Sequence, residues 1–246
     1  MPSGMTGAQL SALYDARNVW AADDDFFLDF VNQRPNSRVL DLGCGTGRMT
    51  LAVAAAGHSV VGIDPSSDSL AAARMKPRAD EVTWIDGTSA QIPVAHAFDV
   101  AIMTAHVAQA INDDDAWSRT LADVHRALVP GGSLAFDSRD PAARAWEHWT
   151  PAETRRRHTL PDGSMVDAWA ESTVELDGRV ALTEHRVYNG GVPEPEISVL
   201  AFRTEDQLRQ DLATAGFTID RIYGGWSGED VGAGEGELIV IARKPA

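Results

Sequence analysis

A carboxylate and three closely spaced glycines form the strongest chemical pattern in the sequence. Asp41 is followed by Gly43, Gly45 and Gly47, so the glycines stand at alternate positions. Residues 38–42 are short and mostly apolar, which is typical of an interior parallel strand. A loop of glycines can adopt unusual dihedral angles and lets a ligand lie directly on the backbone. The amides of the helix predicted to follow would point at that loop, so the sequence predicts a ligand cradle.

The charge beside the loop indicates which kind of ligand the cradle holds. A dinucleotide loop has the pattern G-x-G-x-x-G and seats a pyrophosphate at a helix N-terminus. Here the glycines follow the pattern G-x-G-x-G, and Asp41 would repel a pyrophosphate. S-adenosylmethionine has no phosphate and carries an ammonium and a sulfonium. The local charge therefore fits S-adenosylmethionine better than NAD.

The run Asp41-Leu42-Gly43-Cys44-Gly45-Thr46-Gly47 resembles the signature loop of class I S-adenosylmethionine-dependent methyltransferases of the small-molecule type. The resemblance is good over about residues 38–137 and extends in strand order to the C-terminal part. It implies an α/β fold, with a doubly wound, mostly parallel, seven-stranded Rossmann-like sheet. It also implies an enzyme that uses S-adenosyl-L-methionine to methylate an N or O atom of a small molecule.

Composition and charge limit the cellular location and the binding partners that we expect. The chain has 246 residues, one cysteine and a formal net charge of −15. No apolar run approaches the ~20 residues needed to span a bilayer, no signal peptide is evident, and a single cysteine excludes an internal disulfide, so a cytoplasmic location is expected. The acidity disfavours nucleic acid and anionic membranes as partners. We expect a small-molecule acceptor, and a monomer or a homodimer.

Alternating strand and helix patterns predict a parallel sheet with right-handed crossovers. The predicted strands are residues 38–42, 59–63, 82–85, 98–103, 133–137, 218–223 and 238–243. A helix from about Asp113 is expected to stop at Pro130-Gly131-Gly132. Ligands of such sheets bind beyond the carboxyl ends of the strands. Those ends carry Asp41, Asp64, Asp86, Thr104 to His106, and Ser138-Arg139.

An insertion interrupts this pattern between the fifth and sixth strands. Turn signals at Pro161-Asp162-Gly163, Asp177-Gly178 and Asn189-Gly190-Gly191 predict an antiparallel sheet of three or four strands. Its place in the chain puts it above the carboxyl ends of the strands, as a lid. The predicted organisation is an N-terminal helical cap segment (1–37), a Rossmann-like cofactor-binding domain (38–144 and 203–246) and an inserted β lid over the substrate site (145–202).

Acids at the second and third strand ends are the expected nucleoside ligands. Asp64 lies 23 residues after Asp41 (64 − 41), where an acid usually accepts the ribose hydroxyls; its alternative role is a helix N-cap. The resemblance implies that Asp86 contacts the adenine amino group, although strand-end aspartates also cap turns. The residues predicted to bind the cofactor are Asp41, Gly43, Cys44, Gly45, Gly47, Asp64, Pro65, Asp86, Gly87 and Thr104. Cys44 is interpreted as a small packed residue rather than a nucleophile.

A general base is needed only if the methyl acceptor must lose a proton. His106, just after the fourth strand, and Tyr14, in the segment expected to fold over the cofactor, are the predicted catalytic residues. Packing or cofactor contact is an equal alternative for either one. Trp20, Arg139 and Trp146 are predicted to contact the substrate, with core or lid packing as the alternative for the tryptophans. No spacing of His, Cys and Asp resembles a metal site, so no metal is expected.

Two other functions remain open from the sequence. An NAD-dependent oxidoreductase is disfavoured by Asp41 and by the glycine spacing. A non-catalytic S-adenosylmethionine-binding module would share the whole loop, and only turnover of the cofactor separates it from an enzyme. The identity of the acceptor is not encoded in any motif, because specificity would reside in the N-terminal segment and the insertion.

Overall fold

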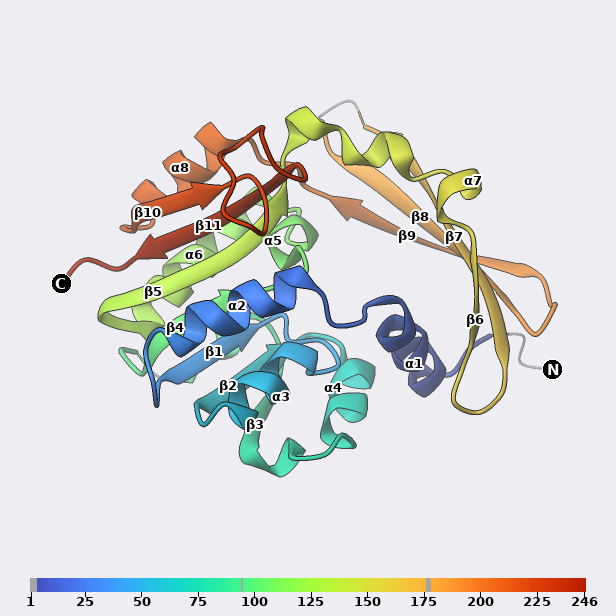
Figure 1. Cartoon of the computed structure of the whole chain (residues 1–246), viewed down its shortest axis with the longest axis horizontal. Coiled ribbons are helices and arrows are strands. Elements are labelled where there is room, and N and C mark those ends of the chain that lie inside the picture. The colour runs from blue at the N-terminus through green and yellow to red at the C-terminus, as the bar shows by residue number, and fades with distance from the viewer. Residues whose placement is uncertain (1–3, 94, 176–177) are drawn as a thin grey trace.

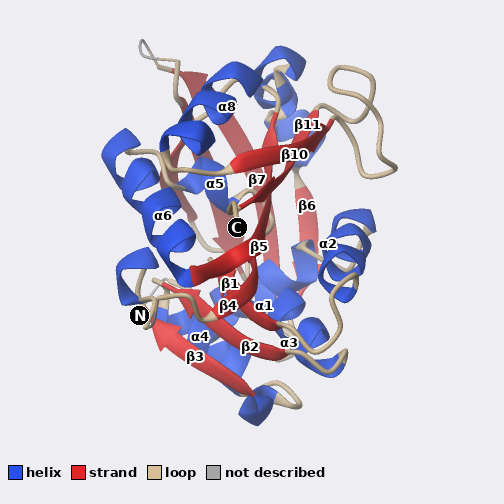
Figure 2. Ribbon diagram, turned by 90° about the vertical axis from the view of Figure 1, so that its left-hand side faces the viewer, coloured by secondary structure: helices blue, strands red, loops and turns tan. Residues whose placement is uncertain are grey.

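Two sheets of different construction build the molecule (Figure 1). The computed structural model describes residues 4–93, 95–175 and 178–246. A seven-stranded sheet carries helices on both faces (Figure 2), and a four-stranded antiparallel sheet stands apart from it. The N-terminal helix α1 (Gly7–Arg17) lies between the two sheets. Among the described residues, every helix is too short or too polar to cross a lipid bilayer.

The large sheet has the strand order β10-β11-β5-β4-β1-β2-β3. Only β11 runs antiparallel to its neighbours, so the predicted mostly parallel, doubly wound sheet is confirmed. Its strands are β1 (Arg38–Leu42), β2 (Ser59–Asp64), β3 (Val82–Asp86), β4 (Phe98–Met103), β5 (Leu128–Arg139), β10 (Thr218–Tyr223) and β11 (Glu237–Arg243). The carboxyl ends of β1, β2, β4 and β5 lie next to one another at one edge, as the parallel pairing requires.

Two apolar layers hold this sheet. The remaining helices are α2 (Ala22–Asn32), α3 (Arg48–Ala55), α4 (Ser67–Arg74), α5 (Val107–Ala110), α6 (Asp114–Ala127), α7 (Pro151–Thr154) and α8 (Glu205–Thr214). On one face Trp117 of α6 packs edge-on against Phe136 of β5, with ring centroids 5.6 Å apart. On the other face Phe27 and Val31 of α2 pack against β1 and α3. Burial of these large side chains, each worth about 1.5–3 kcal/mol, fixes the sheet beneath the site.

One boundary prediction is wrong. Helix α6 ends at Ala127, and β5 begins at Leu128 rather than at residue 133, so Pro130-Gly131-Gly132 belongs to the strand. The N–H of Gly131 donates to the carbonyl of Lys244, and the N–H of Lys244 donates to the carbonyl of Gly132. Pairing with the end of the chain therefore keeps this glycine-rich segment in the sheet.

The insertion forms the predicted antiparallel sheet, with four strands in the order β6-β7-β8-β9. These are β6 (Arg156–Thr159), β7 (Met165–Val174), β8 (Val180–Tyr188) and β9 (Pro193–Leu200). The predicted turns at Pro161-Asp162-Gly163 and Asn189-Gly190-Gly191 join β6 to β7 and β8 to β9; the third, Asp177-Gly178, includes Asp177, which lies outside the described residues. Leu13 of α1 is buried against Leu160 and Val166, so α1 docks on this sheet.

Candidate functional site

The glycine loop and Asp64 form one hydrogen-bonded unit. The N–H of Gly45 donates to Oδ2 of Asp64 at 2.7 Å, and the N–H of Ser66 donates to Oδ1 at 2.8 Å. The N–H of Gly43 donates to the carbonyl of Ile63 at 2.7 Å, which holds the loop on β2. Each carboxylate oxygen has further acceptor capacity. Asp64 can therefore organise the loop and still accept ribose hydroxyls.

Asp41 is buried, and only one of its two carboxylate oxygens has a hydrogen-bond partner among the described residues. The side chain is 1% exposed, and Oδ2 accepts a hydrogen bond from the Thr50 hydroxyl at 2.6 Å. No described residue gives a partner to Oδ1. Burial, together with the negative charge of Asp64, raises the pKa of Asp41 to about 7. A buried, unsatisfied carboxylate is costly, and a cation at the glycine loop would satisfy it. The ammonium of S-adenosylmethionine has that chemistry, so the residues fit the predicted cofactor.

Beside this loop lies a mainly apolar cavity of about 390 Å³. Its lining includes Gly43, Asp64, Pro65 and Gly87 from the predicted cofactor set; Gly87 directly follows β3. Asp86 is exposed and does not line the cavity. Thr104 follows β4 and is half-buried. The remaining wall comes from residues that the sequence did not single out: Leu42, Thr88, Ser89, Ala90, Val107, Ala110, Ile111, Ala116, Arg119, Thr120 and Asp123.

Cys44 is packed and unreactive, as the sequence predicted. It is 8% exposed, and burial raises the pKa of its thiol. The thiolate form, which a nucleophile requires, is therefore suppressed. Its Sγ would lie 3.1 Å from a Cβ added at Gly62, so the side chain fills space beneath the loop.

The N-terminal segment is tied over the glycine loop. Asp15 of α1 accepts from the Thr46 hydroxyl and pairs with Lys76 at 2.7 Å. Arg48 donates to the carbonyls of Asn18 and Val19 in the link between α1 and α2. These contacts hold α1 near the cofactor cavity. Trp20 lies in the same link, where its indole N–H donates to Asp25 at 2.7 Å.

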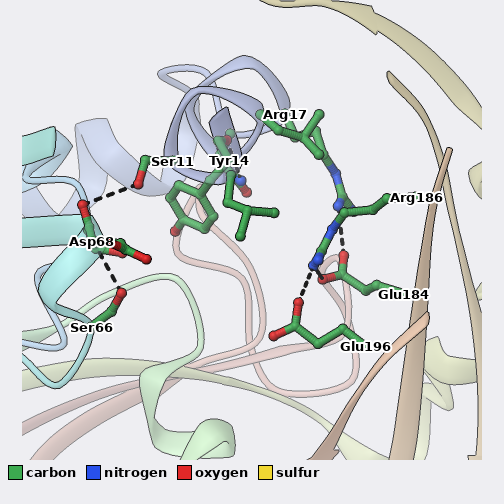
Figure 3. A pocket seen from close by; sticks show the side chains of 12 residues that line it. Ser11, Tyr14, Arg17, Ser66, Asp68, Glu184, Arg186 and Glu196 are labelled. Carbon is green, nitrogen blue, oxygen red and sulfur yellow. Dashed lines mark hydrogen bonds and ion pairs between the residues drawn. The ribbon is translucent and has the colours of Figure 1, made fainter. Parts of the chain in front are cut away.

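A second cavity, of about 360 Å³, opens between α1, the start of α4 and the inserted sheet (Figure 3). Tyr14 lines it, with burial raising the pKa of its phenol. From the sheet come Glu184, Arg186 and Glu196, with Arg186 lying 2.5 Å from Glu196 and 3.2 Å from Glu184. Arg17 of α1 pairs with Glu184 at 2.7 Å. The wall is thus polar and charged on the sheet side.

His106 lies between two carboxylates that the sequence analysis missed. Its Nε2 is 3.0 Å from Oε2 of Glu237 and 3.3 Å from Oδ2 of Asp137, and its backbone N–H donates to Asp137 at 2.9 Å. One ligand atom from each residue lies within 4.8 Å of the others, close enough to hold a metal ion. Burial, followed by the charge of Glu237, raises the pKa of Asp137 to about 6. Neither acid belongs to a motif, because β5 and β11 bring them to His106 from distant parts of the chain.

Arg139 ends β5, two residues after Asp137, and Trp146 lies at the start of the insertion. The Arg139 guanidinium is 5.2 Å from the Trp149 ring centroid and donates to Oε1 of Gln109 at 3.0 Å. Trp146 packs edge-on against Phe202, with centroids 4.6 Å apart. The structure therefore brings only part of the predicted set together: cofactor residues at the glycine loop, and His106 and Arg139 near the ends of β4 and β5. Tyr14 lines the separate cavity beside the inserted sheet, and Trp20 is bonded to Asp25.

Comparison with known proteins agrees with this geometry. The model of a methyltransferase domain matches residues 39–132. The cypemycin N-terminal methyltransferase of Streptomyces sp is 27% identical over 206 residues, covering 84% of this chain and 82% of that protein. The malonyl-(acyl-carrier protein) O-methyltransferase of Pectobacterium atrosepticum is 30% identical over 136 residues, covering 53% of this chain and 51% of that protein. The X-ray structure of a sugar N-methyltransferase from Streptoalloteichus sp ATCC 53650 has a TM-score of 0.74 and 17% identity, covering 100% and 96% of the two chains.

The fold and the site define a Rossmann-like enzyme of methyl transfer. The chain is a class I S-adenosylmethionine-dependent methyltransferase, and S-adenosylmethionine is its cofactor. This assignment decides against the oxidoreductase and the non-catalytic alternatives. When bound, the cofactor supplies a methyl group on a sulfonium, a good leaving group.

Proposed function

We propose that this methyltransferase methylates a nitrogen or oxygen atom of a small molecule, with His106 as the general base. The observation that carries the proposal is the pair of contacts at Nε2 of His106. Carboxylate oxygens only accept hydrogen bonds, so Nε2 carries the hydrogen that faces Glu237 and Asp137. The neutral ring then keeps its electron pair on Nδ1. No described residue forms a hydrogen bond with Nδ1, which leaves that nitrogen to accept a proton.

The position of His106 supports this role. Its neighbour Val107 would touch a Cβ at Gly43 and also lines the cofactor cavity. The imidazole therefore stands one residue from the cofactor wall and is 21% exposed. Positioning of acceptor and cofactor supplies most of the catalysis. Proton removal adds to it for acceptors that are ammonium ions or hydroxyls.

Tyr14 is proposed to orient the acceptor or the sulfonium region. It projects from α1 into the cavity shared with the inserted sheet (Figure 3). Its raised pKa keeps the hydroxyl protonated at neutral pH, so it donates a hydrogen bond rather than removing a proton. Trp20, Arg139 and Trp146 stay proposed substrate contacts.

The inserted sheet is proposed to act as a lid over the acceptor. The division retained is residues 1–37 as cap, 38–144 and 203–246 as cofactor domain, and 145–202 as lid. The N–H of Ala201 donates to the carbonyl of Gln109, and Asn112 donates to the carbonyl of Val199 at 2.8 Å. These bonds link the end of the lid to the segment that carries His106. An N-methyltransferase and an O-methyltransferase among the relatives support N or O as the target.

The proposed cellular location and binding partners follow from the composition. With a net charge of −15 and a free, buried Cys44, we propose a cytoplasmic enzyme without a nucleic-acid partner, as a monomer or a homodimer.

A screen of amines and alcohols with methyl-labelled S-adenosylmethionine tests the function and supplies an acceptor. With that acceptor, His106→Gln should lower kcat about 10²–10⁴-fold while the dissociation constant of the cofactor stays within about twofold. The matched control is His148→Gln, because His148 is exposed and also faces a carboxylate, that of Glu153. A wild-type rate in His106→Gln would leave positioning as the mechanism and refute the base assignment. Loss of cofactor binding would make His106 part of the cofactor pocket.

A further inference from the structure

Arg139 differs from the other buried or half-buried arginines in what its guanidinium contacts. Arg48, Arg186 and Arg203 each face a carboxylate at 4.0 Å or less. In the part of the chain that the structure describes, no carboxylate oxygen lies that close to Arg139. It donates to the amide oxygen of Gln109 and lies over the ring of Trp149. Since a guanidinium has five N–H donors, most of its hydrogen-bonding capacity is free.

Glu237, the carboxylate expected to pair with Arg139, contacts another residue instead. Glu237 stands directly opposite Arg139 in the antiparallel pairing of β11 with β5, where opposite charges normally pair. Instead, both Glu237 oxygens lie 3.0–3.2 Å from Nε2 of His106. Asp137, two residues before Arg139 on the same face, also turns to His106. The acids are thus engaged by the imidazole, and the guanidinium stays available.

Gln109 holds Arg139 at a cost. The glutamine side chain is fully buried, and its Nε2 has no partner among the described residues. A buried amide nitrogen left unpaired destabilises the folded protein. Its Oε1 serves Arg139, accepting from Nη1 at 3.0 Å and from the backbone N–H at 3.4 Å. The amide therefore fixes the guanidinium without neutralising its charge, as a carboxylate would.

The surroundings suit a charged group attached to an organic molecule. Burial lowers the pKa of Arg139, while the charges of Glu237 and Asp137 act on it in the opposite direction. In such surroundings, an anion interacts with it more strongly than at an open surface. Trp149 covers the guanidinium, and Phe202 contacts both Trp149 and Trp146. Arg139 also follows Asp137, which places it beside the proposed base.

We propose that Arg139 binds an anionic group of the methyl acceptor, a carboxylate or a phosphate, with Gln109 as its positioning residue. The proposal rests on the proposed function, because it assumes an acceptor held at the ends of β4 and β5. The acceptor class is then an amine or alcohol that also carries an acid. A guanidinium fits carboxylate and phosphate equally well, through paired N–H donors.

Calorimetry on the protein loaded with S-adenosylhomocysteine, at low ionic strength, tests this without knowledge of the acceptor. The probes are benzoate, phenyl phosphate and the neutral benzamide. Wild-type protein should bind at least one of the acids ten times more tightly than benzamide. A better fit of benzoate would indicate a carboxylate acceptor, and of phenyl phosphate a phosphate acceptor. Equal binding of all three probes would overturn the proposal.

Three variants test whether the preference for the acids depends on Arg139. Arg139→Gln should remove the preference for the acids, and so should Gln109→Glu, because the new carboxylate would pair with the guanidinium. Arg144→Gln is the control, since Arg144 is exposed and paired with Glu147 at 2.6 Å; it should keep the preference. Retention of the preference in both Arg139→Gln and Gln109→Glu would contradict the proposal. Binding of S-adenosylhomocysteine by the same samples reports on folding, and turnover of methyl-labelled S-adenosylmethionine in the acceptor screen reports on the methyltransferase function separately.

Discussion

The cofactor half and the acceptor half of this enzyme are assembled in different ways. In the cofactor half, the bond from Gly45 to Asp64 joins residues 19 apart, and the bond from Thr50 to Asp41 joins residues 9 apart. In the acceptor half, His106 meets Glu237 across 131 residues, and Arg17 meets Glu184 across 167. The hydrogen bonds of the glycine loop with Asp41 and Asp64 lie within one contiguous βαβ segment, residues 38–64. The acceptor half exists only after the whole chain has folded.

This difference indicates which parts of the enzyme can vary in sequence while the cofactor site is kept. The cofactor half relies on backbone amides, glycines and two acids, so one short motif specifies it for a single ligand. The acceptor half draws on β5, β11, the inserted sheet and α1; of these, α1 is also bonded to the glycine loop, through Asp15 and Thr46. We therefore expect substitutions in the two halves to have separable effects.

The glycine loop should show the largest effect, and unequally between its members. A Cβ at Gly43 would lie 2.4 Å from a methyl of Val107, whereas one at Gly45 has nothing within 4 Å; both residues have positive φ. Gly45→Ala should cost about 1–2 kcal/mol from the backbone alone. Gly43→Ala adds about 1–3 kcal/mol of overpacking against a stiff side chain. Urea unfolding of the two variants measures this, and equal midpoints would refute the difference.

Asp41 should make cofactor binding depend on pH. Its pKa of about 7 in the folded protein is above the unfolded value, so its contribution to stability is full below about pH 4 and is lost as pH rises through 7. Cofactor binding has the opposite sign, because the ammonium favours the ionised carboxylate. Between pH 5 and 7 the affinity should rise by up to about tenfold per pH unit. Calorimetry on wild type and Asp41→Asn checks this, and an equal pH dependence in both would contradict it.

The ion pair between α1 and the inserted sheet should show the smallest effect. Arg17 and Glu184 have side chains 34% and 27% exposed, and Glu184 keeps Arg186 as a second partner. Surface pairs contribute about 0.2–1 kcal/mol. Arg17→Gln should therefore lower the free energy of unfolding by less than about 1 kcal/mol and leave cofactor affinity unchanged. A loss above about 2 kcal/mol would mean that this pair, rather than the Leu13 contact, holds α1 on the sheet.

The sequence predicted the strands of the large sheet and the glycine loop well, for a physical reason. Strand periodicity, the glycine spacing and the acids at strand ends are local features, and they located the loop, Asp41, Asp64 and all seven strands of the large sheet. Turn signals predicted the inserted sheet in the same way. The prediction was wrong at Pro130-Gly131-Gly132, because pairing with Lys244 at the far end of the chain overrides a local stop signal.

The partners of His106 could not be predicted in this way. From the sequence, Asp137 is predicted only as the end of a strand and Glu237 has no predicted role, since neither residue belongs to a motif. Their meeting depends on the antiparallel register of β11 against β5, which pairs Glu237 with Arg139. Gln109 was missed because it lies on a four-residue helix, α5, too short to leave a periodic pattern. Register and short helices are set by tertiary contacts.

The most direct test of the separation of the two halves is the dissociation constant of S-adenosylhomocysteine, measured by calorimetry for wild type, Asp64→Ala and Glu237→Gln. Wild type should bind in the micromolar range, about −8 kcal/mol. Asp64→Ala should weaken binding by about 1–3 kcal/mol, because it leaves loop amides and ribose hydroxyls unpaired. Glu237→Gln should bind like wild type. Weakening by Glu237→Gln as large as that by Asp64→Ala would contradict the account, since the two halves would then form one site.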